Sequence, residues 1–335
     1  MPEDRPRPQQ QFLFGPPDPQ PGPGQDDGPV RPAPVDADVQ ALAARLPSAL
    51  RLGTSSWSFA GWNGLVYAAG TRANRLARDG LGAYAQHPLL RTVGVDRTFY
   101  APIDRSEFAA YAAAVPADFR FLVKAWSECT TPRRRDGGAN PRYLHVDTLI
   151  EHVLTPAALG LGDALGPLLL QFPPQGPAIT RAPDAFADRL HAFLAALPRG
   201  VAWHVDLRDR ELLTARYAAA LQDASAHHCY SLHPRLPELD RQRELVPPTG
   251  PVLVRWMLHQ GLGYDEAKAR YQPFDRLVDP DPPRRAAIVA LCADALRRQL
   301  PVTVVVNNKA EGSAPRSLLE LARALLAEPD DSMPR

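Results

Sequence analysis

The stretch GTSSWSFAGWNGLVY, residues 53–67, starts as a short strand and breaks at once into a loop of serine, glycine and aromatic residues. Loops that follow strands in α/β proteins are where ligands are commonly bound. Two tryptophans and a tyrosine in such a loop predict either a ligand-binding loop or aromatic side chains that plug one end of a barrel.

Eight apolar β-like runs alternate with helical runs rich in alanine, leucine and arginine from residue 36 onward. The expected strands are Arg51–Ser55, Thr92–Asp96, Phe119–Lys124, Leu168–Phe172, Val201–Leu207, Cys229–Leu232, Val252–Met257 and Val302–Val306. The expected helices include Asp38–Leu46, Ser106–Ala114, Asp184–Leu197, Thr214–Ala224, Pro283–Gln299 and Arg316–Leu326. Most strands are continuous apolar runs, which is typical of strands buried on both faces. Eight β/α units predict an α/β protein with a (β/α)8 TIM-type barrel, and no G-x-G-x-x-G fingerprint of an open doubly wound sheet follows the first strand.

The chain divides into three parts by composition. Residues 1–35 are rich in proline and glycine and predict a disordered tail, because a run such as GPPDPQPGPG (residues 15–24) lacks the backbone donors of a helix or sheet. Residues 36–328 predict a single barrel domain, and residues 329–335 a flexible C-terminus.

Charge and composition argue against several classes of function. The formal net charge is +1, so no global field attracts nucleic acid or an anionic membrane. No apolar run approaches the roughly 18 residues needed to cross a bilayer. The cysteines Cys129, Cys229 and Cys292 are widely spaced and odd in number, which indicates reduced thiols. We expect a cytoplasmic protein that binds a small molecule, without nucleic-acid or membrane partners, and favour a monomer.

Lys124 is the strongest single candidate for a catalytic residue. It closes the strand at 119–124, and in a barrel the carboxyl ends of the strands converge on the mouth where active sites lie. A desolvated lysine has a lowered pKa and serves as a Schiff-base nucleophile, a proton shuttle or an anion anchor. The alternative is a structural ion pair with Asp96 or Asp206.

Further polar and aromatic residues lie at the other strand ends. Asp206 and Arg208 share one face of their strand, so Asp206 is a candidate for proton transfer and Arg208 for clamping a carboxylate or phosphate. If the two side chains point outward, they only place polar groups beside a neighbouring helix and take no part in a site. Gln171 either orients a substrate hydroxyl or bonds a neighbouring side chain. The full candidate set is Lys124 and Asp206 as catalytic residues, with Thr54, Trp57, Trp62, Thr98, Tyr100, Gln171, Arg208, Arg255, Trp256, Asn307 and Asn308 as substrate-binding residues.

Six sequence blocks, in order, resemble the DUF72 family of YecE-like proteins, also named UPF0759. They are GTSSWSFAGWNG (53–64), RTFY (97–100), DFRFLVKA (118–125), LGPLLLQFPP (165–174), VDLR (205–208) and VNNKAEGSAP (306–315). The resemblance spans about residues 50 to 326. It implies a TIM-type barrel and carries no established activity.

The chain also departs from the family pattern. Gly94 stands where the family usually has glutamate, and Asp206 is shorter than the usual glutamate. Residues 209–212 replace the usual H-P-S-W, and Met257 lies where the histidine of R-x-H-G is expected. These departures indicate either an altered substrate or a loss of catalysis.

The sequence supports two main functional hypotheses. The first is an enzyme that acts on a small polar, sugar-like or anionic substrate by Lys/Asp proton transfer of the lyase or isomerase type. The second is a non-catalytic ligand-binding or scaffold barrel. A metal-assisted hydrolase is a further alternative, although no H-x-x-x-H spacing supports it, and we predict no metal site and no cofactor.

Overall fold

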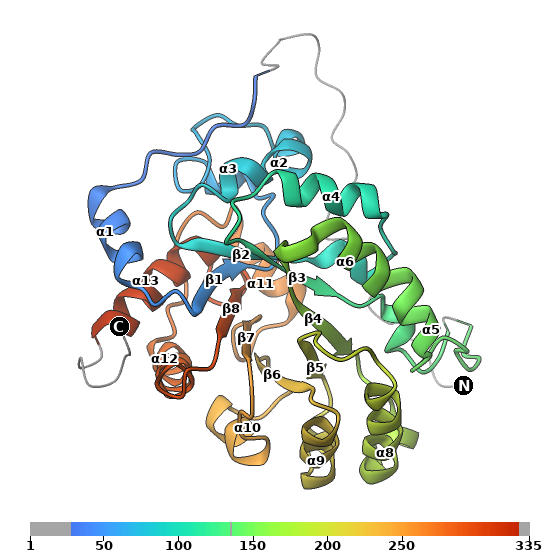
Figure 1. The fold of residues 1–335 in the computed structure, drawn as a ribbon. Helices are drawn as coiled ribbons and strands as arrows, with labels where there is room; N and C mark the ends of the chain where they lie inside the picture. The colour runs from blue at the N-terminus through green and yellow to red at the C-terminus, as the bar shows by residue number, and fades with distance from the viewer. Residues whose placement is uncertain (1–27, 135, 328–335) are drawn as a thin grey trace, which may run out of the picture.

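Eight parallel strands close into a barrel in the computed structural model, which describes residues 28–134 and 136–327 (Figure 1). The strands are β1 Leu50–Thr54, β2 Leu90–Val95, β3 Arg120–Lys124, β4 Leu165–Phe172, β5 Trp203–Leu207, β6 His227–Leu232, β7 Val252–Trp256 and β8 Val302–Val306. They follow one another around the barrel in chain order, and β8 pairs with β1. The predicted TIM-type barrel is therefore confirmed, and every predicted strand overlaps an observed one.

Most of the helices surround the barrel (Figure 1). Their bounds are α1 Ala37–Arg45, α2 Ala73–Asp79, α3 Leu81–Tyr84, α4 Arg105–Ala113, α5 Val146–Leu149, α6 Thr155–Leu161, α7 Pro177–Thr180, α8 Pro183–Ala195, α9 Ala215–Asp223, α10 Leu239–Leu245, α11 Tyr264–Tyr271, α12 Pro282–Arg297 and α13 Ala314–Ala327. No helix among the described residues is long and apolar enough to cross a membrane.

Local sequence explains the boundaries and buried faces of these helices. α12 begins at Pro282, and the Asp281 side chain accepts a hydrogen bond from the backbone N–H of Arg284 at 3.2 Å. A proline in the first turn and an aspartate cap satisfy the open end of a helix. In α13 the buried Leu318, Leu321 and Leu325 recur at helical spacing, so the helix turns one apolar face to the barrel.

Two apolar layers stabilise the fold. The larger lies between the strands and the helices and includes Phe121 and Val123 of β3. The smaller consists of Leu122, Leu169, Cys229, Leu253 and Val305, which come from five different strands. Successive side chains of a strand point to opposite faces, so this second cluster fills the barrel interior.

Gly53 brings the first two strands into close contact. A Cβ atom at this position would lie 1.9 Å from the backbone oxygen of Thr92 on β2. The first glycine of the stretch at 53–67 is thus required by packing, because any side chain would collide with the neighbouring strand.

The predicted element boundaries lie within two residues of the observed ones, except at the start of β4. β4 begins at Leu165 rather than Leu168, and the register against β3 shifts where Gly166 and Pro167 lie. Proline cannot donate to the ladder, so an irregularity is the physical way to include it.

The predicted N-terminal tail is too long. Residues 1–27 of it lie outside the described residues, as do positions 329–335 of the predicted C-terminus. Residues 28–35, however, pack against the barrel domain: Pro32 forms an antiparallel bridge with Tyr67, and the N–H of Ala33 donates to Val66 at 2.9 Å. This backbone pairing overrides the local proline content. The three cysteines are free and buried.

Candidate active site

A layer of polar side chains lies directly above the apolar plug of the barrel. Moving two residues along each strand from the interior cluster toward its carboxyl end gives Lys124, Gln171, Ser231, Arg255 and Asn307. The same alternation places them inside the barrel, at its carboxyl mouth. The apolar cluster lies beneath this layer, and each of its side chains is at most 1% exposed.

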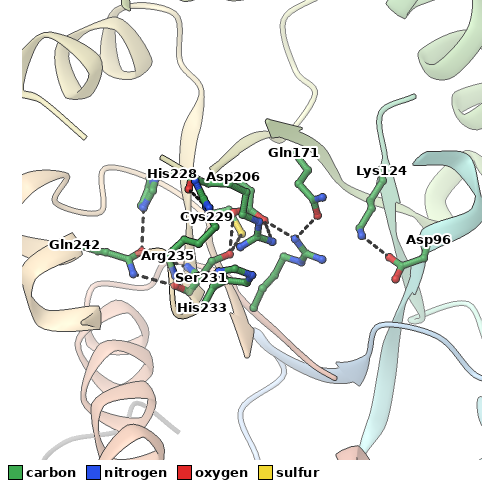
Figure 2. A network of polar contacts seen from close by, with 12 residues as sticks. Asp96, Lys124, Gln171, Asp206, His228, Cys229, Ser231, His233, Arg235 and Gln242 are labelled. Carbon is green, nitrogen blue, oxygen red and sulfur yellow. Dashed lines mark hydrogen bonds and ion pairs between the residues drawn. The ribbon is translucent and has the colours of Figure 1, made fainter. Parts of the chain in front are cut away.

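Lys124 ends β3 and forms an ion pair with Asp96, which starts the short helix η2 Asp96–Phe99 after β2. The Lys124 Nζ lies 2.8 Å from Asp96 Oδ1 (Figure 2). Burial lowers the pKa of Lys124 from its ordinary 10.5 to about 8, although Asp96 acts in the opposite direction. The backbone of Lys124 is fixed as well, because Thr98 Oγ1 donates to its carbonyl oxygen at 2.7 Å.

Asp206 on β5 is fully buried and accepts hydrogen bonds from three side chains (Figure 2). Its Oδ2 accepts from Arg208 Nη2 at 2.9 Å and also from Arg255 Nη1, while its Oδ1 accepts from Ser231 Oγ at 3.0 Å. Burial raises the pKa of Asp206, but the two arginines outweigh it and the pKa is lowered. Asp206 is thus an ionised carboxylate that holds two guanidinium groups.

Gln171 and Asn307 are bonded within the same layer. Gln171 Oε1 accepts from Arg255 Nη1 at 2.9 Å, and Asn307 Nδ2 donates to Ser55 Oγ at 2.8 Å. Gln171 is partly exposed, so its amide marks the open side of the mouth. Bonding to a neighbouring side chain, one of the two interpretations of Gln171, is what the structure shows.

Lys309 is a mouth residue absent from the sequence-predicted set. It follows β8 and is buried, and its Nζ lies 4.1 Å from the ring centroid of Tyr264 and 5.7 Å from that of Phe274. Burial lowers its pKa from 10.5 to about 8. A signal was available in the sequence: the chain has only three lysines among 38 basic residues, and this is one of them.

An aromatic cavity of about 280 Å³ opens beside Asp96. Its lining includes Trp57, Phe59, Gly94, Asp96, Tyr100 and Tyr111. The rings of Trp57 and Tyr111 meet edge to face with centroids 5.4 Å apart, and Tyr100 is 45% exposed. Gly94 lies close to the first loop, because a Cβ atom there would be 3.0 Å from the backbone oxygen of Ser55.

Five predicted binding residues lie in structural positions instead. Trp62 and Trp256 are fully buried in the hydrophobic core, so stacking of their rings on a ligand does not fit this structure. Trp62 Nε1 donates to Asn308 Oδ1 at 3.2 Å, which ties the first loop to the last. Thr54 Oγ1 contacts Tyr84 Oη at 2.8 Å, and Thr98 braces the backbone of β3 as described above. Trp62 is therefore a packing residue rather than a ligand-facing one.

The remaining predicted residues lie together at the carboxyl mouth of the barrel. Lys124, Asp206, Arg208, Gln171, Arg255 and Asn307 share the interior layer, and Trp57 and Tyr100 line the adjoining cavity. Among the described residues, no group of three or more histidine, cysteine, aspartate or glutamate side chains is placed to hold a metal ion.

Comparisons with known proteins agree with this architecture. The profile of the DUF72 family, described as a protein of unknown function, matches residues 51–335, and the chain belongs to this family. A DUF72 family protein of Enterococcus faecalis V583 shares 20% identity with a TM-score of 0.58, covering 85% of this chain and 98% of that one. A DUF72 family protein of Thermotoga maritima MSB8 shares 19% identity with a TM-score of 0.53, covering 83% of this chain and 99% of that one. At this identity the likeness is one of fold. No curated protein matches the chain.

Proposed function

We propose that the barrel is an enzyme that binds a small polar, sugar-like or anionic substrate at its carboxyl mouth, with Lys124 as the proton-transfer residue of a lyase or isomerase type of step. One observation carries this proposal: a buried lysine with a lowered pKa is ion-paired to Asp96, and Asp96 also lines an aromatic cavity. Perturbed titratable groups beside a cavity are typical of catalytic sites.

The pKa of Lys124 suits a general base. At a pKa of about 8, roughly a tenth of the amine is neutral at pH 7, close to the balance that favours proton transfer. The neutral Nζ takes a proton from a carbon next to a substrate carbonyl, and the electron pair of the broken C–H bond moves into an enolate. Asp96 stabilises the ammonium group that forms. Return of the proton to another carbon completes an isomerisation, and loss of a β-substituent completes an elimination.

Asp206 has a different role in this scheme from the one expected of it. A fully buried carboxylate that accepts from two arginines and a serine has little tendency to take up a proton. We assign it to holding Arg208 and Arg255 in place, where their positive charge stabilises negative charge on the bound substrate.

Lysine is rare in this arginine-rich chain, and this favours a catalytic role for Lys124 over a purely structural ion pair. Two of the chain's three lysines, Lys124 and Lys309, are buried at the mouth, while the third, Lys268, is exposed on α11. Arginine remains charged under all ordinary conditions, whereas a buried lysine titrates near neutrality. An ion pair with a purely structural role does not require a group that titrates near neutral pH.

The test starts with a thermal-shift screen of the full chain against sugars, sugar phosphates, small carboxylic acids and nucleotides, followed by turnover assays of each stabilising compound. We expect Lys124→Met to bind the compound but to lose at least about 100-fold in kcat. Lys268→Met, which removes the exposed lysine by the same substitution, is the matched control and should keep full activity. Undiminished turnover in Lys124→Met would refute the proposal, and binding without turnover in the unmodified protein would favour the non-catalytic barrel.

A further inference from the structure

The buried charges at the mouth do not balance. The positive groups are Lys124, Lys309, Arg208 and Arg255, each less than a tenth exposed. The carboxylates among them are Asp206, which is fully buried, and Asp96, whose side chain is 12% exposed. Asp209 is also buried nearby, but it accepts from Arg235 at 3.2 Å and from the backbone of Gln175. Four buried cations thus face two carboxylates that are free to compensate them.

Three guanidinium donors in this layer have no acceptor. They are Nη1 of Arg208 and both Nε and Nη2 of Arg255, which are buried and form no hydrogen bond with any residue that the structure describes. A buried donor without an acceptor destabilises a protein, and a charged donor does so more strongly, so native proteins rarely leave three together. An acceptor bound between the two guanidinium groups would satisfy these donors.

The two guanidinium groups converge on one atom. Arg208 Nη2 and Arg255 Nη1 both donate to Asp206 Oδ2, which fixes the two side chains beside one another. Their remaining donors belong to the same two planar groups, and Lys124 lies close enough that both arginines depress the pKa of its amine. Paired guanidinium groups with free N–H donors match the oxygens of a carboxylate or phosphate.

We infer that Arg208 and Arg255 form a subsite for the oxyanion group of the substrate, a carboxylate or a phosphate, with Lys124 beside it. This inference rests on the proposed function for the identity of the site and narrows the substrate class to anionic molecules. The oxyanion supplies the missing acceptors and compensates the excess positive charge, while Asp206 keeps both arginines oriented. Because both arginines act on the pKa of Lys124, an anion bound by them would lie near the proton-transfer residue, as expected when the substrate carbonyl and the oxyanion belong to one small molecule.

The experiment measures binding of inorganic phosphate and, separately, of acetate to the full chain by calorimetry, at constant ionic strength balanced with chloride. Saturable binding of either ion is expected. Arg208→Gln should weaken it at least about tenfold, because a charge-assisted hydrogen bond is lost. Arg208→Lys keeps the charge but loses the fork of donors. Its affinity for the ion should lie between those of the unmodified protein and Arg208→Gln. Tighter phosphate binding identifies a phosphorylated substrate, and tighter acetate binding a carboxylic acid.

The matched control is Arg297→Gln, the same substitution in the last turn of α12, at the opposite end of the barrel just before β8. It should bind both ions as the unmodified protein does. Absence of saturable binding of both ions, or equal binding by Arg208→Gln and Arg297→Gln, would overturn the inference.

A second measurement needs no variant and covers the case in which Arg208→Gln fails to fold. With lysine labelled with ¹³C at Cε, phosphate or acetate should raise the pKa of Lys124 relative to chloride, because a neighbouring anion stabilises the ammonium group. An unchanged titration in both ions overturns the inference. Since these readouts are binding and titration, they stand even if no substrate is turned over, and their failure leaves the proton-transfer proposal to its own test.

Discussion

Replacing Lys124 by methionine should change how the stability of the protein depends on pH. The ammonium group is costly to bury: the drop of the Lys124 pKa from 10.5 to about 8 corresponds to about 3.5 kcal/mol in the folded state, at about 1.4 kcal/mol per pH unit. Below pH 8 the lysine is charged in both folded and unfolded chains, and the full cost applies. Between about pH 8 and pH 10.5 the unfolded chain binds more protons than the folded one, so this cost is relieved as the pH rises.

The free energy of unfolding of the unmodified protein, relative to Lys124→Met, should therefore rise by about 1 kcal/mol between about pH 7 and pH 9. Urea unfolding at a series of pH values measures this difference, and groups that titrate in both proteins cancel in it. Lys268→Met is the matched control for the loss of one lysine. Parallel stability curves for the unmodified protein and Lys124→Met would refute the argument that burial depresses the lysine pKa.

Three other substitutions test the packing around the site, each by its denaturant midpoint. Asp206→Asn should destabilise the fold by about 3–5 kcal/mol, because two buried guanidinium groups lose their counter-charge; a loss below about 1 kcal/mol would contradict the assigned role. Gly53→Ala should lower stability by about 1–3 kcal/mol, since its Cβ would lie 1.9 Å from a backbone oxygen of β2, and an unchanged midpoint would show that β1 can move away. Trp62→Phe should lower stability by about 1–2 kcal/mol through the smaller ring and the lost hydrogen bond to Asn308. Unchanged stability there would mean that the two loops are not held together by this contact.

The barrel could be predicted from the sequence because its strands are short, buried on both faces and regularly spaced. Val302–Val306 shows why: one threonine among valines reads as a central strand without any knowledge of its neighbours. The start of β4 could not be predicted in the same way, since Gly166 and Pro167 are signals that normally end a strand. The fold absorbs them in a register shift that only the neighbouring strand reveals.

The candidate site was predictable as a set of strand ends, but not as a network. Alternation along the strands places Lys124, Gln171 and Asp206 at the mouth, yet it cannot show that Asp206 pairs with Arg255, which is 49 positions away. The sequence pattern also cannot distinguish aromatic side chains that line a cavity from those that are fully buried. Trp57 and Trp62 lie in one loop and both pack into the core, but Trp57 keeps 8% of its surface exposed and also lines a cavity, whereas Trp62 is fully buried. Lys309 was missed because its importance comes from the surrounding rings of Tyr264 and Phe274, which belong to a distant segment.

The most direct test of the central claim is the pKa of Lys124 itself. The chain has three lysines, so labelling with lysine carrying ¹³C at Cε gives a spectrum simple enough to assign with Lys124→Met and Lys268→Met. The account predicts that the signal of Lys124 titrates near pH 8 in the folded protein. A midpoint at the ordinary lysine value of 10.5 would contradict it, because the amine would then be a permanently charged partner of Asp96 and not a base poised for proton transfer.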